Sequence, residues 1–132
     1  MIEFRNLTKR NIGVKELKRV AKRVLQGEKR PREHLSVVFV GPKLMRTLHK
    51  RYRGKDKAAN VLAFPGKELG LGEIVLCPEA ISKDISKYGI LKKQALSFML
   101  VHGLLHLLLY DHETEKDWRI MKQKEQHYLS FK

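Results

Sequence analysis

Residues 95–112 read ALSFMLVHGLLHLLLYDH, and this apolar stretch decides the fold. Apolar residues occupy nearly every position as far as Tyr110, which is typical of a helix buried on all sides rather than of an amphipathic surface helix. The run is broken by polar residues and is shorter than the ~20 apolar residues that a bilayer-spanning helix needs. The stretch therefore predicts a buried central helix, over residues 91–109, with no membrane segment.

Three histidines in this stretch, His102, His106 and His112, have the spacing of metal ligands. An interval of four residues places two imidazoles on one face of a helix, and the next six residues allow the chain to turn and bring back a third. Two imidazoles on an apolar helix are costly to bury without a shared partner. Three neutral nitrogens suit one tetrahedral Zn²⁺ ion with an open fourth position, where the pKa of bound water falls from ~15.7 to about 7. The spacing predicts a zinc-dependent hydrolase.

The residue after the first histidine argues against a peptidase. Zinc peptidases carry a glutamate at this position, where it acts as general base. Here the position holds Gly103, although the histidine spacing matches that of the metzincin peptidases. A metallopeptidase is therefore only a minor alternative. Without a carboxylate base, charge that develops on the reacting group requires a basic side chain, as it does for a phosphodiester.

The charge of the chain is strongly positive and unevenly distributed. The formal net charge is +14, from 28 Lys and Arg against 14 Asp and Glu. Residues 1–66 hold 18 basic and 5 acidic residues, whereas residues 67–132 hold 10 and 9. Such a concentration attracts polyanions, and nucleic acid is the expected partner. The alternative is a solvated basic surface that serves solubility, but solubility does not require the asymmetry.

The length of 132 residues predicts a single domain over residues 1–132. The single cysteine, Cys77, excludes an internal disulfide and is typical of a reducing compartment. The first residues lack the apolar run behind a basic start that marks a secretory signal. We therefore expect a cytoplasmic protein.

Hydrophobic periodicity predicts the remaining elements. The expected strands are residues 2–5, 34–40, 60–64 and 73–77, and the expected helices are residues 14–25, 42–54, 78–88, 91–109 and 114–128. Strands and helices mix without strict alternation, which favours the α+β class. We expect a single sheet of about four strands covered by helices, with a buried central helix that carries the metal-binding histidines.

The histidine stretch resembles the signature of the YbeY-type rRNA maturation factors, a bacterial family of single-domain metal-dependent endoribonucleases. The family pattern H-G-x-L-H-L-x-G-Y-D-H corresponds to residues 102–112. Two further patterns, Y-R-x-K-D-x-x-T-D-V-L-S-F-P and L-G-D-I-V-I, correspond to residues 52–65 and 71–76. The likeness covers about residues 35–127.

The resemblance implies cleavage of ribosomal RNA precursors and a role in maturation of the small ribosomal subunit. It carries over His102, His106 and His112 as ligands of one zinc ion. The family's important arginine corresponds to Arg53, for which we expect a catalytic contact with the scissile phosphate or its transition state. The alternative is a ribosome-associated assembly factor with a structural metal and little catalysis.

Three positions depart from the family patterns. Leu109 replaces a glycine whose left-handed turn ends the helix, a conformation that costs leucine on the order of 1 kcal/mol. Asn60 replaces an aspartate and Ala63 replaces a serine. These changes bear on catalytic efficiency rather than on the fold, and they favour the assembly-factor alternative modestly.

Overall fold

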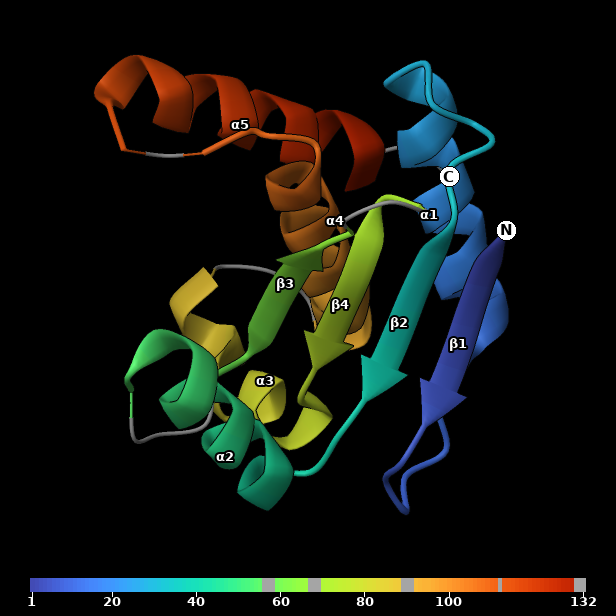
Figure 1. Cartoon of the computed structure of the whole chain (residues 1–132). Helices are drawn as coiled ribbons and strands as arrows, with labels where there is room; N and C mark the ends of the chain where they lie inside the picture. The colour runs from blue at the N-terminus through green and yellow to red at the C-terminus, as the bar shows by residue number, and fades with distance from the viewer. Residues whose placement is uncertain (56–58, 67–69, 89–91, 112, 130–132) are drawn as a thin grey trace.

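The computed structural model of the chain describes residues 1–55, 59–66, 70–88, 92–111 and 113–129. The strands are β1 (Ile2–Asn6), β2 (Leu35–Phe39), β3 (Val61–Pro65) and β4 (Gly72–Leu76). The helices are α1 (Val14–Gly27), α2 (Pro42–Arg53), α3 (Pro78–Asp84), α4 (Ala95–Leu107) and α5 (Glu115–Leu129), with short 3₁₀ turns η1 (Ile85–Tyr88) and η2 (Lys92–Gln94). Figure 1 shows one open sheet with α4 behind it and α5 crossing the end of α4. The α+β prediction is confirmed.

The sheet has the strand order β1-β2-β4-β3. The first three of these strands run parallel, and β3 pairs antiparallel with β4 at one edge. The last two strands, β3 and β4, therefore form a hairpin. The middle of its connection, residues 67–69, lies outside the described residues. The hairpin leaves β3 as an edge strand with one row of backbone groups turned away from the sheet.

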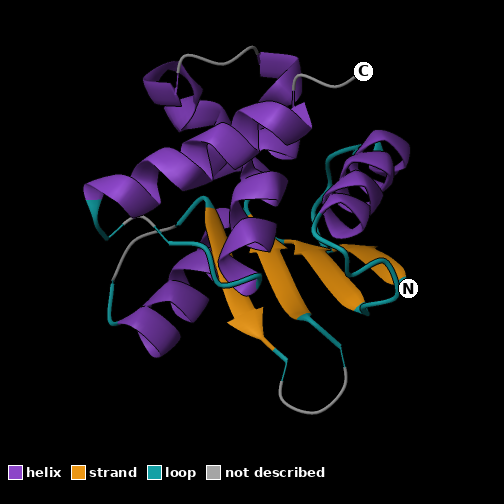
Figure 2. Ribbon diagram, turned by 90° about the horizontal axis from the view of Figure 1, so that it is seen from above, coloured by secondary structure: helices purple, strands orange, loops and turns teal. Residues whose placement is uncertain are grey.

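Alternation along β2 separates the two faces of the sheet. Leu35, Val37 and Phe39 are fully buried in the larger core, which α1, α4 and α5 supply from one side. Figure 2 shows these three helices together on that side of the sheet. Ser36 and Val38 point to the other face, where α2 contributes Met45 to a smaller core. This second face is only partly covered, and beside the apolar Val38 and Val75 it carries the polar pair Ser36 and Glu73.

The central helix α4 is buried as predicted, with eight of its thirteen residues in the core. It begins at Ala95 rather than at residue 91, because the preceding residues form the 3₁₀ turn η2. A Cβ atom on Gly103 would lie 3.0 Å from Val61 Cγ2 and 3.2 Å from Ile74 Cγ2. The glycine therefore lets the helix approach the sheet closely at β3 and β4.

The turn after α4 has the left-handed conformation that the family pattern implies, even though leucine stands in it. Leu109 has a φ of 73°. Its N–H donates to the carbonyl of His106 at 3.0 Å, and the N–H of Tyr110 donates to the carbonyl of Leu105 at 3.0 Å. These are the two bonds of a Schellman motif. The chain thus accepts the strain and keeps the turn.

Two further helices also differ in extent from the prediction. The helix expected over residues 78–88 is α-helical only to Asp84 and continues as η1. The helix expected to stop at residue 25 runs to Gly27, and Lys29 adopts the left-handed conformation, with a φ of 64°. Within the described residues, no helix is long and apolar enough to cross a membrane.

Candidate metal centre

The structure brings two of the three predicted ligands together on α4. Nε2 of His102 lies 3.2 Å from Nε2 of His106. The ring centroids are 4.7 Å apart and the ring planes are nearly perpendicular, at 81°. Two nitrogens about 2.0–2.1 Å from a tetrahedral zinc ion are separated by about 3.3 Å. The pair therefore fits two ligands of one zinc ion.

Glu125 of α5 fixes the orientation of the first histidine. Its Oε2 lies 2.6 Å from Nδ1 of His102, and its side chain is only 11% exposed. A carboxylate oxygen accepts hydrogen bonds, so Nδ1 carries the hydrogen and Nε2 keeps its lone pair for a cation. Carboxylates commonly orient metal-binding histidines in this way. The helix-to-helix contact thus selects the tautomer that a metal site requires.

The third predicted ligand, His112, lies outside the described residues. Within residues 1–55, 59–66, 70–88, 92–111 and 113–129, no group of three or more His, Cys, Asp and Glu side chains is arranged to hold a metal ion. The described part of the site is therefore a pair of histidines. The side chain of His102 is 25% exposed. The complete trio stays a prediction.

Arg53, the predicted catalytic residue, ends α2 and reaches the edge strand. Its Nη2 donates to the carbonyl of Ala63 at 3.1 Å, and its Cζ lies 5.6 Å from the ring centroid of Phe64. Cys77 N–H donates to the carbonyl of Asn60, so alternate residues from Asn60 onward bond to β4 and Ala63 turns its carbonyl to the free edge. Arg53 therefore lies against β3, the strand on which the histidine-bearing helix also packs.

A cluster around Glu28 anchors the turn that follows the histidine pair. Its carboxylate accepts hydrogen bonds from the Tyr110 hydroxyl at 2.5 Å, from Lys124 Nζ at 3.1 Å and from the Tyr128 hydroxyl. Burial alone would raise the pKa of Glu28, but these hydrogen bonds outweigh it and lower the pKa below its ordinary value. The cluster joins the end of α1 to α5 and to the residue that follows Leu109.

Comparison with known proteins identifies the family. Residues 3–131 match the family Endoribonuclease YbeY. The chain belongs to the YbeY family. A YbeY endoribonuclease of Bdellovibrio bacteriovorus is 45% identical over 104 residues, which are 78% of this chain and 67% of that protein. Another, of Syntrophotalea carbinolica, is 33% identical over 136 residues, which are 95% of this chain and 91% of that protein.

A further relative and a solved structure are also similar to this chain. A YbeY endoribonuclease of Thermodesulfovibrio yellowstonii is 40% identical over 103 residues, and this chain spans 65% of its length. The solution structure of a Thermotoga maritima protein superposes with a TM-score of 0.70 at 28% identity. That match covers 98% of this chain and 87% of the other. Family and fold are thus supported independently.

The predicted enzyme class, a hydrolase of the nuclease type, is confirmed by membership of the YbeY family. The family is also consistent with a metal-dependent enzyme. The packing of Gly103 against Val61 and Ile74 adds a reason against a peptidase. The position at which a peptidase carries its glutamate base faces the sheet here, so a side chain at this point would meet the core instead of a substrate.

The sequence prediction missed Glu125 and Glu28. Glu125 shares a helical face with Met121 and Tyr128, both buried, and an acidic residue at such an inward position signals a polar partner. Its partner on α4 lies 23 positions away in the sequence. Glu28 carries no comparable signal, because it follows Gly27 in what reads as an ordinary surface turn.

Proposed function

We propose that this chain is a cytoplasmic, zinc-dependent endoribonuclease that cleaves ribosomal RNA precursors during maturation of the small ribosomal subunit. The observation that carries the proposal is the pair of Nε2 atoms of His102 and His106, 3.2 Å apart. His112 is the third ligand of the single zinc ion in this proposal. Family membership supports RNA as substrate, and the net charge of +14 supports a polyanionic partner.

A bound zinc ion supplies a Lewis acid and lowers the pKa of water at the site. The chain's own residues then have separate tasks. Glu125 holds His102 in the tautomer that keeps Nε2 available. Arg53 uses two N–H groups on backbone carbonyls of Tyr52 and Ala63. A guanidinium has five such donors, so others remain to bind a phosphate oxygen as charge develops on it.

The zinc ligands are tested by His106→Ala. Zinc content, measured on purified protein by elemental analysis, is expected to fall from about one ion per chain toward zero, because two imidazoles do not complete a tetrahedral site. Cleavage of a ribosomal RNA precursor fragment is expected to disappear with it. His127→Ala, which changes a histidine outside the trio, is the matched control and retains both. Zinc-free cleavage by His106→Ala at the normal rate would overturn the proposal.

The role of Arg53 is tested by Arg53→Ala. If its guanidinium stabilises charge in the transition state, kcat falls by roughly 10²–10³, whereas RNA binding at equilibrium changes little. Arg51→Ala, which removes an arginine two positions away, retains kcat. An equal fall in binding and in turnover would assign Arg53 to substrate binding alone.

The assembly-factor alternative loses part of its support. The replacement of the family's glycine by Leu109 raised the question of whether the left-handed turn is kept. Leu109 does adopt the left-handed conformation. At Ala63 the contact with Arg53 comes from the backbone carbonyl, which a serine shares. Of the three departures, only Asn60 removes a charge, because it replaces the charged aspartate of the family pattern with a neutral amide. Catalysis is therefore the better-supported reading.

A further inference from the structure

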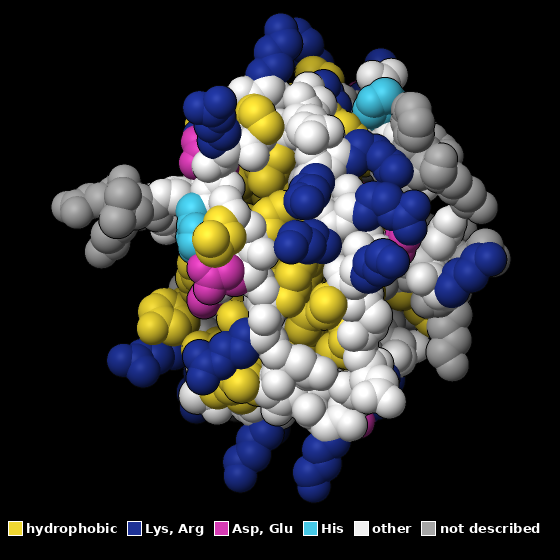
Figure 3. Space-filling view, turned by 90° about the vertical axis from the view of Figure 1, so that its right-hand side faces the viewer, with side chains coloured by type: hydrophobic (Ala, Val, Ile, Leu, Met, Phe, Trp, Pro, Cys, Tyr) yellow, Lys and Arg dark blue, Asp and Glu magenta, His cyan; other side chains and the backbone are white. Residues whose placement is uncertain are grey.

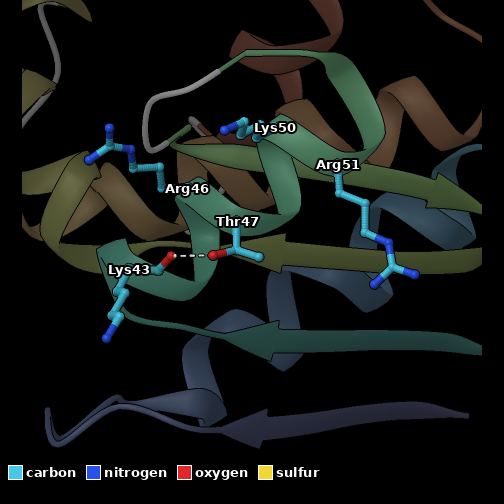
Figure 4. Close-up of a pocket in the computed structure, with 5 residues that line it drawn as sticks. All are labelled: Lys43, Arg46, Thr47, Lys50 and Arg51. Carbon is cyan, nitrogen blue, oxygen red and sulfur yellow. Dashed lines mark hydrogen bonds between the residues drawn. The ribbon is translucent and has the colours of Figure 1, made fainter.

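The outward face of α2 carries a stripe of basic side chains. Lys43, Arg46 and Lys50 are all exposed and recur at intervals of three and four residues. With Thr47 and Arg51 they line an open pocket of about 650 Å³. Figure 4 shows these three along one side of the helix, with Arg51 reaching away from them, and the Thr47 hydroxyl donating to the Lys43 carbonyl at 3.1 Å. We call Lys43, Arg46 and Lys50 the α2 stripe.

The stability of the helix does not account for this charge. α2 contains no acidic residue, and its first turn carries Lys43 instead. A cation in the first turn opposes the helix dipole, at a cost of about 0.3–1 kcal/mol. Lys50, in the last turn, is favourable for the dipole, but Lys43 is not. The position of Lys43 is therefore not accounted for by the helix dipole, and an anionic partner would compensate this cost.

The spacing of the α2 stripe fits a nucleic-acid backbone. Seven residues of helix place Lys43 and Lys50 about 10 Å apart along the axis. At the ~3.4 Å rise per nucleotide of a strand stacked as in a double helix, this distance corresponds to about three nucleotides. The described residues that line the pocket include no aromatic ring on which a base would stack. The surface therefore offers contacts to phosphates rather than to bases.

We propose that the α2 stripe binds the phosphate backbone of the RNA substrate, outside the segment that is cut. α2 ends at Arg53, which contacts the edge strand beside the histidine-bearing helix. In this proposal, an RNA strand bound at Arg53 continues over the outward face of α2 toward the first turn of that helix. The proposal rests on the proposed function, and it adds a surface that increases affinity for long RNA without taking part in cleavage.

The test compares long and short RNA with a triple variant, Lys43→Ala, Arg46→Ala and Lys50→Ala. Alanine favours helix, so α2 is retained. For single-stranded RNA of about 20 nucleotides, longer than a site of ~4–16 nucleotides, we expect affinity at low salt to fall at least tenfold. The slope of log K against log salt falls by about 2, at roughly 0.7 per phosphate contact. Cleavage of an RNA of about 4 nucleotides, which fills only the cut segment, is unchanged.

The matched control removes the same charge elsewhere. Figure 3 shows that Lys and Arg side chains also cover the side of the molecule that carries β1 and α1. On α1, Lys15, Lys18 and Lys22 are exposed. The triple variant Lys15→Ala, Lys18→Ala and Lys22→Ala lowers the net charge by the same three units and is expected to change affinity for long RNA less than threefold. Equal losses in both triple variants would show an effect of overall charge only and would overturn the proposal.

The outcomes separate this surface from the proposed function. If the unchanged protein binds and cleaves RNA and Arg53→Ala loses turnover, but the α2 triple variant binds long RNA normally, the proposed function stands and the stripe is excluded. If the unchanged protein neither binds nor cleaves RNA, both proposals fail together. A tenfold loss on long RNA with unchanged cleavage of short RNA supports both.

Discussion

The contact between Glu125 and His102 shows how one buried carboxylate orients a histidine of the proposed metal site. The Oε2 to Nδ1 distance of 2.6 Å leaves no space for water between the two side chains. The remaining nitrogen, Nε2, then points toward the same atom of His106. Protein contacts alone thus give the two nitrogens the spacing that the proposed zinc site requires.

Glu125→Gln tests this arrangement. The amide no longer enforces hydrogen on Nδ1, so part of the His102 population takes the other tautomer and blocks Nε2. Zinc affinity, measured by competition with a chromogenic chelator, is expected to fall by about 10–100-fold. The tautomer itself is read from the ¹⁵N shifts of the His102 ring in the zinc-free protein. The control Glu115→Gln, on the exposed part of α5, should change neither zinc affinity nor the His102 tautomer. Unaltered zinc affinity in Glu125→Gln would show that Glu125 has no role in the site.

Leu109 is a residue at which the chain tolerates strain. It has a positive φ of 73°, and the residue is 86% exposed, so it gains little from packing. Leu109→Gly is expected to raise the free energy of unfolding by about 1 kcal/mol, because glycine adopts this conformation without strain. Urea unfolding measures the change. Leu109→Ala retains a Cβ and should show no gain, and an equal gain in both variants would point to removal of an exposed apolar side chain instead.

The end of α1 illustrates the scale of whole elements. The helix α1 ends at Gly27, but the residue with the left-handed conformation after it is Lys29. The glycine serves a different purpose. A Cβ on Gly27 would lie 2.5 Å from the hydroxyl oxygen of Tyr128 and 2.7 Å from its Cε1. The absence of a side chain therefore sets how closely α1 and α5 approach.

Gly27→Ala is expected to destabilise the protein by about 1–3 kcal/mol, although alanine is the better helix former by about 1 kcal/mol. Tyr128 is 2% exposed and bonded to Glu28, so it has no room to move away. Thermal unfolding measures the loss. Gly13→Ala, where a Cβ would meet nothing within 4 Å, serves as control. Loss of equal size at Gly13 would refute the steric explanation.

At the scale of the whole molecule, Glu28 connects parts of the fold that are distant in sequence. It lies 82 positions from Tyr110 and 100 from Tyr128. Its side chain is 8% exposed. The hydrogen bond to Glu28 raises the pKa of Tyr110, and likewise that of Lys124. Charge and hydrogen bonding in this cluster therefore couple α1, α5 and the turn after α4.

This coupling predicts a pH dependence of stability. The pKa of Glu28 is lowered from 4.5, so its contribution is fully present above that value and is lost as the pH falls through the lowered pKa. Glu28→Gln is expected to cost about 2 kcal/mol at neutral pH. Relative to the unchanged protein, this deficit shrinks in acid. Urea unfolding at pH 7 and at low pH measures this loss of unfolding free energy, with Glu16→Gln as a surface control. A loss that is independent of pH would contradict the role of the Glu28 charge.

The tyrosine and lysine partners act at the opposite end of the pH range. The pKa of Tyr110 is raised from 10.0 and that of Lys124 from 10.5. Their contributions are therefore present below these values and are lost as the pH rises through the raised pKa values. The Glu28 cluster therefore stabilises the folded state between the lowered pKa of Glu28 and the raised pKa values of Tyr110 and Lys124.

The sequence by itself determined the elements and the histidine-bearing helix. Apolar run length, alternation and histidine spacing are local properties, so the sequence alone predicts α4, the four strands and the pairing of His102 with His106. Element ends were less well determined, because a 3₁₀ turn at η1 or η2 and a left-handed Lys29 depend on what the helix ends contact.

Only the tertiary structure decided which distant groups meet. Glu125 reaches His102, Glu28 reaches Tyr110, and Arg53 reaches the outward carbonyl of Ala63. Each contact joins residues from different elements, and its geometry follows from how α4 and α5 pack together and how β3 lies at the sheet edge. A sequence pattern reports periodicity along one chain segment, whereas these contacts depend on the packing of several segments in three dimensions.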